Sequence, residues 1–225
     1  METQETALHL LNHPFRLMVS GRSMSGKTTT VVKFITMMLP KEKWHRIILV
    51  SPTSSQPTFN PIRKMIKYTF TEASEDVFNH IERMCAAAMR KGSKNPIPSP
   101  YRTLLIVDDC SAEKSTNRGR KGSYSKLANN ARWLNLSIIT ITQNLSSISP
   151  SFRDNAEGLM LFHTLNQKEK EYIIQERNPF DNAKDMYAIM DSARQEPHDF
   201  LFQVMTTEGV FHYRNFDINL TIEKE

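Results

Sequence analysis

The sequence predicts an α/β domain in which helices cover both faces of a mostly parallel sheet. Three observations lead to this class. Short apolar, β-branched runs alternate with longer amphipathic stretches, as parallel strands joined by crossover helices do. The first run passes through a glycine-containing loop directly into a helical stretch. The last two runs are separated by Thr207-Glu208-Gly209, so we expect a C-terminal β-hairpin that extends one edge of the sheet.

The expected strands share β-branched and large aliphatic residues and are bounded by turn-forming residues. In chain order they are Phe15–Ser20, Arg46–Val50, Thr103–Val107, Ser137–Thr142, Gly158–His163 and the hairpin strands Phe200–Thr206 and Val210–Arg214. Residues 60–72 are ambiguous and fit a short helix followed by an edge strand at Tyr68–Thr71.

The expected helices follow these strands, and several carry end signals. Pro40 ends the first, and Ser74 with the acids after it is an N-terminal cap of the second. In chain order the helices are Lys27–Leu39, Ser74–Arg90, Ser125–Leu134, Pro150–Ala156 and the amphipathic stretches 167–177 and 181–193. The breaker-rich residues Lys91–Pro100 are expected to form an exposed connector.

Composition sets broad limits. A length of 225 residues suits one domain with a sizeable core, and a net charge of +5 permits contact with a polyanion without requiring it. Cys85 and Cys110 are far apart and fit no metal-binding spacing, which favours a reducing compartment. No signal peptide or apolar run of transmembrane length is present in the sequence, so we expect a soluble intracellular protein.

The stretch from Gly21 to Thr28, G-R-S-M-S-G-K-T, has the Walker A or P-loop form G-x-x-x-x-G-K-[ST]. Its glycines permit the turns that point backbone N–H groups at phosphate oxygens, and Lys27 can reach the β- and γ-phosphates. The hydroxyl of Thr28 can bind Mg²⁺. A strand before the loop and a helix after it support the match over a chance occurrence. The expected nucleotide-binding residues are Gly21, Ser23, Ser25, Gly26, Lys27, Thr28 and Thr29.

A second motif follows the most apolar strand. Leu104-Leu105-Ile106-Val107-Asp108-Asp109 has the Walker B form, which places Asp108 to hold Mg²⁺ with Thr28 and Asp109 to polarise the attacking water. Taken alone, this pattern fits an ordinary strand end equally well. Gln143 follows the next strand and could bind the γ-phosphate or the water, although polar residues at strand ends are common. The parallel-sheet rule collects these groups in one crevice at the carboxyl ends of the strands.

An extra strand lies between the P-loop strand and the Walker B strand. This order indicates the additional-strand type of P-loop NTPase and argues against nucleoside kinases. We therefore expect residues 15–225 to form a single P-loop ATPase domain, preceded by a loosely packed N-terminal arm at residues 1–14.

The motifs G-R-S-M-S-G-K-T-T-T, L-L-I-V-D-D-C and A-R-W-L-N-L-S-I-I-T-I-T-Q together resemble the FtsK–HerA superfamily over residues 15–175, which implies a RecA/FtsK-like sheet. The sequence is most similar to the poxvirus-type genome-packaging ATPases of large DNA viruses and virophages. The resemblance implies an ATP- and Mg²⁺-dependent motor that translocates double-stranded DNA into a capsid. It also implies a homo-oligomeric ring, pentamer or hexamer, that works with capsid or portal-vertex proteins in the virion or a cytoplasmic viral factory.

The same resemblance implies residue roles. Asp109 corresponds to the catalytic acid and Gln143 to the sensor, although many superfamily members carry Glu where Asp109 stands. An arginine on the helix before the sensor strand acts on the next subunit's nucleotide, and Arg132 matches that position. Because this helix leads into the sensor strand, we expect its C-terminal end to lie near one edge of the nucleotide crevice. Arg153 is the second candidate for this role.

Residues 111–124 form a basic loop rich in Ser and Gly. Arg118, Arg120 and Lys121 could grip DNA phosphates in the channel of a ring without reading bases. An ordinary solvated loop explains the same composition equally well.

Two other functions remain open from the sequence. A P-loop nucleotide kinase or GTPase is one, but no N-K-x-D guanine signature or arginine-rich lid is evident. A nucleotide-binding, DNA-associated subunit without motor activity is the other. Asp109 argues against it, because a protein that only binds nucleotide needs no catalytic acid.

Overall fold

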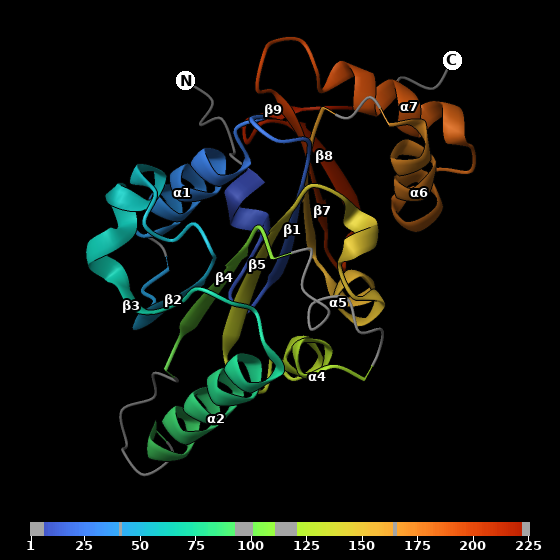
Figure 1. Cartoon of the computed structure of the whole chain (residues 1–225). Helices are drawn as coiled ribbons and strands as arrows, with labels where there is room; N and C mark the ends of the chain where they lie inside the picture. Colours follow the sequence, from blue (N-terminus) through green and yellow to red (C-terminus); the bar gives the residue numbers. More distant parts are fainter. Residues whose placement is uncertain (1–6, 41, 93–100, 111–120, 164–165, 222–225) are drawn as a thin grey trace.

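The computed structural model describes residues 7–40, 42–92, 101–110, 121–163 and 166–221. These residues form a nine-stranded sheet in the order β3-β2-β4-β5-β1-β6-β7-β8-β9 (Figure 1). The pairs from β3 to β6 are parallel and those from β6 to β9 are antiparallel. The strands are β1 Arg16–Ser20, β2 Arg46–Val50, β3 Ile66–Phe70, β4 Thr103–Asp108, β5 Leu136–Thr142, β6 Gly158–Phe162, β7 Phe200–Met205, β8 Val210–Arg214 and β9 Ile218–Asn219.

Helices lie on both faces of this sheet (Figure 1). They are η1 Ala7–Leu10, α1 Lys27–Met38, η2 Pro57–Met65, α2 Glu75–Gly92, α4 Ser123–Asn129, η3 Leu145–Ser147, α5 Pro150–Asn155, α6 Gln167–Arg177 and α7 Ala183–Ser192. This arrangement and the edge hairpin confirm the predicted α/β class.

The two faces carry separate cores, and successive strand residues alternate between them. Leu105 and Val107 of β4 pack with α2 and α4 to α7, whereas Leu104 and Ile106 pack with η1, α1 and η2. All residues of β1, β2, β4, β5 and β6 are buried. Burial on both faces explains why these strands are continuous apolar runs rather than alternating ones.

The N-terminal segment differs from the expected loose arm. Ala7, Leu8 and Leu11 are buried in the core that contains α1, and the Ala7 backbone N–H donates to the Phe216 carbonyl oxygen at 2.7 Å. The His13 ring Nδ1 lies 2.6 Å from the Ser137 hydroxyl oxygen. The apolar residues of A-L-H-L-L fill the space between α1 and the C-terminal strands, so loose packing is wrong for residues 7–14.

The helix before β5 is also shorter than expected. α4 ends at Asn129, and residues 130–135 form turns that finish at Asn135 with a φ of 50°. Asn tolerates this left-handed conformation better than most residues, so Asn135 can turn the chain into β5. Arg132 consequently lies in a turn and not on a helix.

Other differences are small. β3 begins at Ile66 instead of Tyr68, pairs in parallel with β2 and forms the expected sheet edge. Most of the connector predicted at residues 91–100 lies outside the described residues. No helix in the described part of the chain is long and apolar enough to cross a membrane.

Candidate active site

The loop from Gly21 to Gly26 joins β1 to α1 at the carboxyl edge of the sheet. A Cβ added to Gly21 would lie 2.5 Å from Cβ of Phe162 on β6, so the neighbouring strand leaves no room for a side chain. Gly26, directly before α1, has a φ of +94°, which residues with a side chain rarely adopt. Both glycines of the Walker A pattern are therefore required by the geometry of the loop.

Lys27 opens α1 and its ammonium group closes across the loop. Nζ donates to the carbonyl oxygens of Gly21 at 2.6 Å and Arg22 at 2.7 Å. Burial lowers the pKa of Lys27, and the charges of Asp108 and Asp109 oppose that shift. The ammonium therefore lies at the mouth of the loop, near Asp108 at the end of β4 and Asp109 directly after it.

Asp108 is the last residue of β4 and is only 4% exposed. The Thr28 hydroxyl donates toward its carboxylate oxygens at 3.3 and 3.5 Å. Burial raises the pKa of Asp108 to about 6, while the bond from Thr28 and the charge of Lys27 favour the ionised form. A hydroxyl and a carboxylate at this separation are hard oxygen donors of the kind that Mg²⁺ uses alongside water and phosphate oxygens.

The described residues contain no cluster of three or more His, Cys, Asp or Glu that could hold a metal ion by themselves. This is compatible with Mg²⁺, because that ion is bound by one or two protein ligands together with substrate phosphates. Thr28 and Asp108 are the residues that would hold it.

Asp109, unlike the adjacent Asp108, is not buried. It is exposed, has a φ of 54°, and its backbone N–H donates to the Ile141 carbonyl oxygen on β5 at 3.3 Å. The left-handed backbone turns the chain at the strand end. The two adjacent acids are thus separated into a buried one beside Thr28 and an exposed one at the cleft.

Gln143 directly follows β5, which lies between β1 and β4 in the sheet. Its side chain is exposed and lines the same cleft. Two hydrogen bonds hold the turn that carries Gln143. Thr142 Oγ1 accepts from the Asn144 N–H at 3.2 Å, and the Leu145 N–H donates to the Glu169 carboxylate at 2.6 Å.

These groups line one cleft of about 520 Å³. Of the expected nucleotide-binding and catalytic residues, it collects Ser23, Ser25, Gly26, Lys27, Thr28, Thr29, Asp108, Asp109 and Gln143. The cleft also contains residues that sequence reasoning missed, which are Thr53, Gln56, Thr58 and His198. The first three follow β2, so the rule that sites form at strand carboxyl ends could have found them; nothing in the local sequence marks His198.

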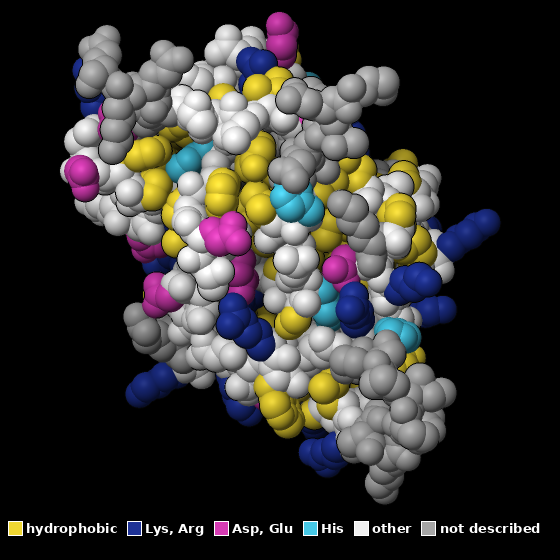
Figure 2. Space-filling model, turned by 180° about the vertical axis from the view of Figure 1, so that it is seen from behind, with side chains coloured by type: hydrophobic (Ala, Val, Ile, Leu, Met, Phe, Trp, Pro, Cys, Tyr) yellow, Lys and Arg dark blue, Asp and Glu magenta, His cyan; other side chains and the backbone are white. Residues whose placement is uncertain are grey.

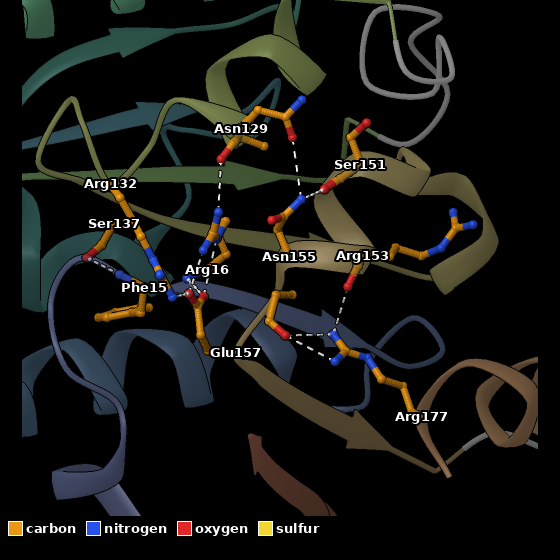
Figure 3. A network of polar contacts seen from close by, with 12 residues as sticks. Phe15, Arg16, Asn129, Arg132, Ser137, Ser151, Arg153, Asn155, Glu157 and Arg177 are labelled. Atoms are coloured by element: carbon orange, nitrogen blue, oxygen red, sulfur yellow. Dashed lines mark hydrogen bonds and ion pairs between the residues drawn. The ribbon is translucent and has the colours of Figure 1, made fainter. Parts of the chain in front are cut away.

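Arg132 lies at the opposite edge of the sheet, where β1 and β5 begin (Figure 3). Its Nη2 is 3.1 Å from Glu157 Oε1, and the same carboxylate binds Arg16 at 2.5 Å. β5 separates Arg132 from Gln143 by seven residues, or about 20 Å at roughly 3.3 Å per residue. The expectation that Arg132 lies near its own nucleotide crevice is therefore wrong.

Arg153 on α5, the second candidate for the arginine that acts in trans, is more buried than Arg132. Its side chain is 10% exposed, and its Nε lies 2.8 Å from Glu176 Oε2 on α6. The guanidinium carbon also lies 5.1 Å from the centre of the Tyr172 ring. These contacts give Arg153 a structural role between α5 and α6, whereas the Arg132 side chain is 72% exposed.

Of the basic loop, Arg118 and Arg120 lie outside the described residues. Lys121 is exposed and lies two residues before α4. Figure 2 shows lysines and arginines spread over one face of the molecule with acidic side chains among them. The described side chains on that face therefore do not form a uniformly basic patch.

Comparison with known proteins gives one family. The model of the family described as Poxvirus A32 protein matches residues 2–214. A search of curated proteins returned no match.

Solved structures share the fold. The genome packaging NTPase B204 from Sulfolobus turreted icosahedral virus 2, in complex with ATP-gammaS, is 16% identical, with a TM-score of 0.64 over 92% of this chain and 100% of that chain. EssC (ATPases 2 and 3) from Geobacillus thermodenitrificans is 14% identical, with a TM-score of 0.62 over 94% of this chain and 41% of that one. The pCW3 conjugation coupling protein TcpA is 15% identical, with a TM-score of 0.62 over 92% and 61%. The P-loop ATPase fold is thus common to all of them.

Proposed function

The chain belongs to the poxvirus A32 protein family, and on that premise we propose that it is an ATP-hydrolysing motor that translocates double-stranded DNA to package a viral genome. The observation that carries this proposal is the cleft at the carboxyl edge of the sheet. There the Walker A loop, a buried acid bonded to Thr28, an exposed acid and a strand-end amide meet. The B204 structures support it further, because a genome packaging NTPase has the same fold over its whole length.

Each side chain of the cleft has a role in phosphoryl transfer to water. Lys27 and the loop N–H groups neutralise and orient the phosphates, which is most of the catalytic task in this reaction. Bound Mg²⁺, held by Thr28 and Asp108, would neutralise charge on the β- and γ-phosphate oxygens. Asp109 accepts a proton from the attacking water, and Gln143 orients that water or the terminal phosphate. A nucleotide-binding subunit without hydrolysis would leave Asp109 without a task.

The assembly follows from the same proposal. Packaging requires a channel for DNA, so we infer a homo-oligomeric ring, pentameric or hexameric, that acts with capsid or portal-vertex proteins. We place it in the virion or in a viral factory in the host cytoplasm.

The test of this function is release of inorganic phosphate from ATP, measured with and without double-stranded DNA. A motor should hydrolyse ATP and respond to DNA. Absence of hydrolysis under both conditions would favour the nucleotide-binding subunit, and phosphate transfer to a nucleotide acceptor would favour a kinase.

Replacing Asp109 with asparagine should slow turnover by about 10²- to 10⁴-fold, because the amide cannot accept a proton from water. Binding of Mg-ATP should be retained, since Thr28 and Asp108 are unchanged. Single-turnover hydrolysis and equilibrium nucleotide binding measure the two effects separately. If Asp109→Asn lost Mg-ATP binding while its remaining turnover stayed normal, the roles assigned to Asp108 and Asp109 would be wrong.

Neutralising Arg118, Arg120 and Lys121 together should weaken DNA binding by a similar factor for all sequences. Each lost phosphate contact should reduce the slope of log affinity against log salt by about one unit. Basal ATP hydrolysis should survive, because the described part of this loop lies outside the cleft. Fluorescence anisotropy over a salt series gives the slope, and an unchanged slope would show that the loop is an ordinary solvated surface.

A further inference from the structure

One edge of the sheet carries a basic surface that the phosphate cleft does not use. Among the described strands, β3 is the last at this end of the sheet order, and it pairs with β2. η2 precedes β3 directly in the chain, and Arg63, Lys64, Lys67 and Tyr68 of these two elements are exposed. Figure 2 shows lysine and arginine side chains gathered at this edge of the molecule, at the right of the view. We call these four residues the η2–β3 surface.

The inward side of the same segment holds this surface in place. η2 is a 3₁₀-helix, so residues three apart lie on the same side of it. Phe59 and Ile62 are fully buried, and Met65 packs against the core that contains α1. Pro57 and Pro61 restrict the backbone of η2. The basic side chains therefore project from a backbone that is already ordered, which reduces the entropy lost when a partner binds.

The lysines of this surface are not neutralised by nearby acids. No ion pair joins Lys64 or Lys67 to a carboxylate within the described part of the chain. The exposed acids that follow in the chain, Glu72 and Asp76, come after β3 has ended. Residues 63–67 thus present a concentration of positive charge, which suits a partner with repeated negative charges.

Arg63 links this surface to the phosphate cleft. Its Nη2 donates to the Gln56 carbonyl oxygen at 2.8 Å, and its Nε donates to Asn60 Oδ1 at 3.3 Å. Gln56 and Thr58, where η2 begins, line the cleft. A partner held by Lys64 would therefore be joined to the cleft through one short, ordered helix.

Lysines on an edge strand have another common use, because they prevent the exposed edge from pairing with strands of other chains. That use accounts for Lys67 on β3. It does not account for Arg63 and Lys64, which lie on η2 before the strand begins. Tyr68 is 44% exposed, and its hydroxyl is a donor of the kind that contacts phosphate oxygens. The composition of the η2–β3 surface therefore fits a phosphate-rich partner better than edge protection alone.

We propose that the η2–β3 surface binds the phosphate backbone of double-stranded DNA. The inference rests on the proposed translocation function, and it adds a contact outside both the phosphate cleft and the basic loop at residues 111–124. Lys, Arg and Tyr side chains contact phosphates without reading bases, so the affinity should not depend on sequence. A motor that moves along DNA of any sequence requires contacts of this kind. An acidic protein segment is the competing partner, and the test separates the two.

The test compares the unchanged protein with a double variant, Lys64→Gln with Lys67→Gln, for binding to a fluorescent DNA duplex over a salt series. Glutamine keeps the edge polar, and Arg63 keeps its contact with Gln56. Each lost phosphate contact reduces the slope of log affinity against log salt by about one unit, so the slope should fall by about two units. Two duplexes of unrelated sequence should show the same fall.

The matched control is a second double variant, Lys168→Gln with Lys184→Gln. These lysines are exposed on α6 and α7, on the other side of the molecule from β3 (Figure 1), so the variant loses the same net charge. Its slope should equal that of the unchanged protein, and thermal unfolding should show that both variants are folded. The same fall in slope in both variants would be an effect of net charge and would overturn the proposal.

Labelled polyglutamate represents the acidic protein segment. A lower slope for duplex DNA in the Lys64 and Lys67 variant alone supports the proposal, whether or not polyglutamate binding changes as well. An unchanged slope for DNA overturns it, and weaker binding of polyglutamate alone would identify the η2–β3 surface as a protein interface.

The result also separates this inference from the proposed function. If the unchanged protein bound no duplex DNA even at low salt, the proposal of a DNA motor would itself fail. Normal DNA binding with an unaffected Lys64 and Lys67 variant would contradict the η2–β3 surface alone.

Discussion

Replacing Lys27 with alanine is expected to abolish ATP hydrolysis, a loss of at least about 10²- to 10³-fold in turnover, and to weaken nucleotide binding. The reason is the position of the ammonium at the mouth of the loop, 2.6 Å from the Gly21 carbonyl oxygen and beside Asp108 and Asp109. No other cation among the described residues lines the phosphate cleft. Steady-state phosphate release and calorimetry with an ATP analogue measure the two effects.

Lys33→Ala is the matched control for this experiment. Lys33 is exposed on the same helix and does not line the cleft, so its replacement removes the same charge without removing a ligand-binding group. Turnover should be unchanged in Lys33→Ala. Normal turnover in Lys27→Ala would show that the loop is not a phosphate-binding site.

Replacing Arg132 with alanine is expected to lower turnover by about 10³- to 10⁵-fold in the proposed ring, the range for an arginine that stabilises the transition state of a neighbouring subunit. Its position at the far edge of the sheet excludes a role in its own cleft, so any large effect has to act across an interface. The local contribution is small by comparison, because an ion pair with an arginine this exposed is worth less than about 1 kcal/mol.

Mixing subunits tests the role in trans. Arg132→Ala subunits combined with Lys27→Ala subunits should regain partial activity, because some interfaces then join an intact loop to an intact arginine. The control is each variant alone under the same conditions, together with a measurement that mixed rings form. If the mixed rings stay as inactive as either parent, Arg132 has no role in trans, and Arg153 should be tested in the same way.

Local sequence determined most of the fold and the phosphate-binding part of the site. Continuous apolar runs such as Thr103–Asp108 identify strands buried on both faces, since such strands have no polar face to show. The Walker A loop is local because its turns and dipoles come from consecutive residues. Asp108, Asp109 and Gln143 are each attached to a strand end, so knowing that the strands are parallel was enough to bring them together.

Tertiary structure decided whatever depended on residues far apart in the chain. The sequence placed Arg132 close to the sensor strand, but a strand has two ends, and Arg132 lies at the end away from the cleft. His198 reaches the P-loop only because β7 pairs antiparallel with β6 and returns the preceding segment to the carboxyl edge. Hydrophobic periodicity reports which residues are buried but carries no information about which distant segment covers them. For that reason the phosphate-binding residues could be read from the sequence, whereas the position of His198 beside them required the folded chain.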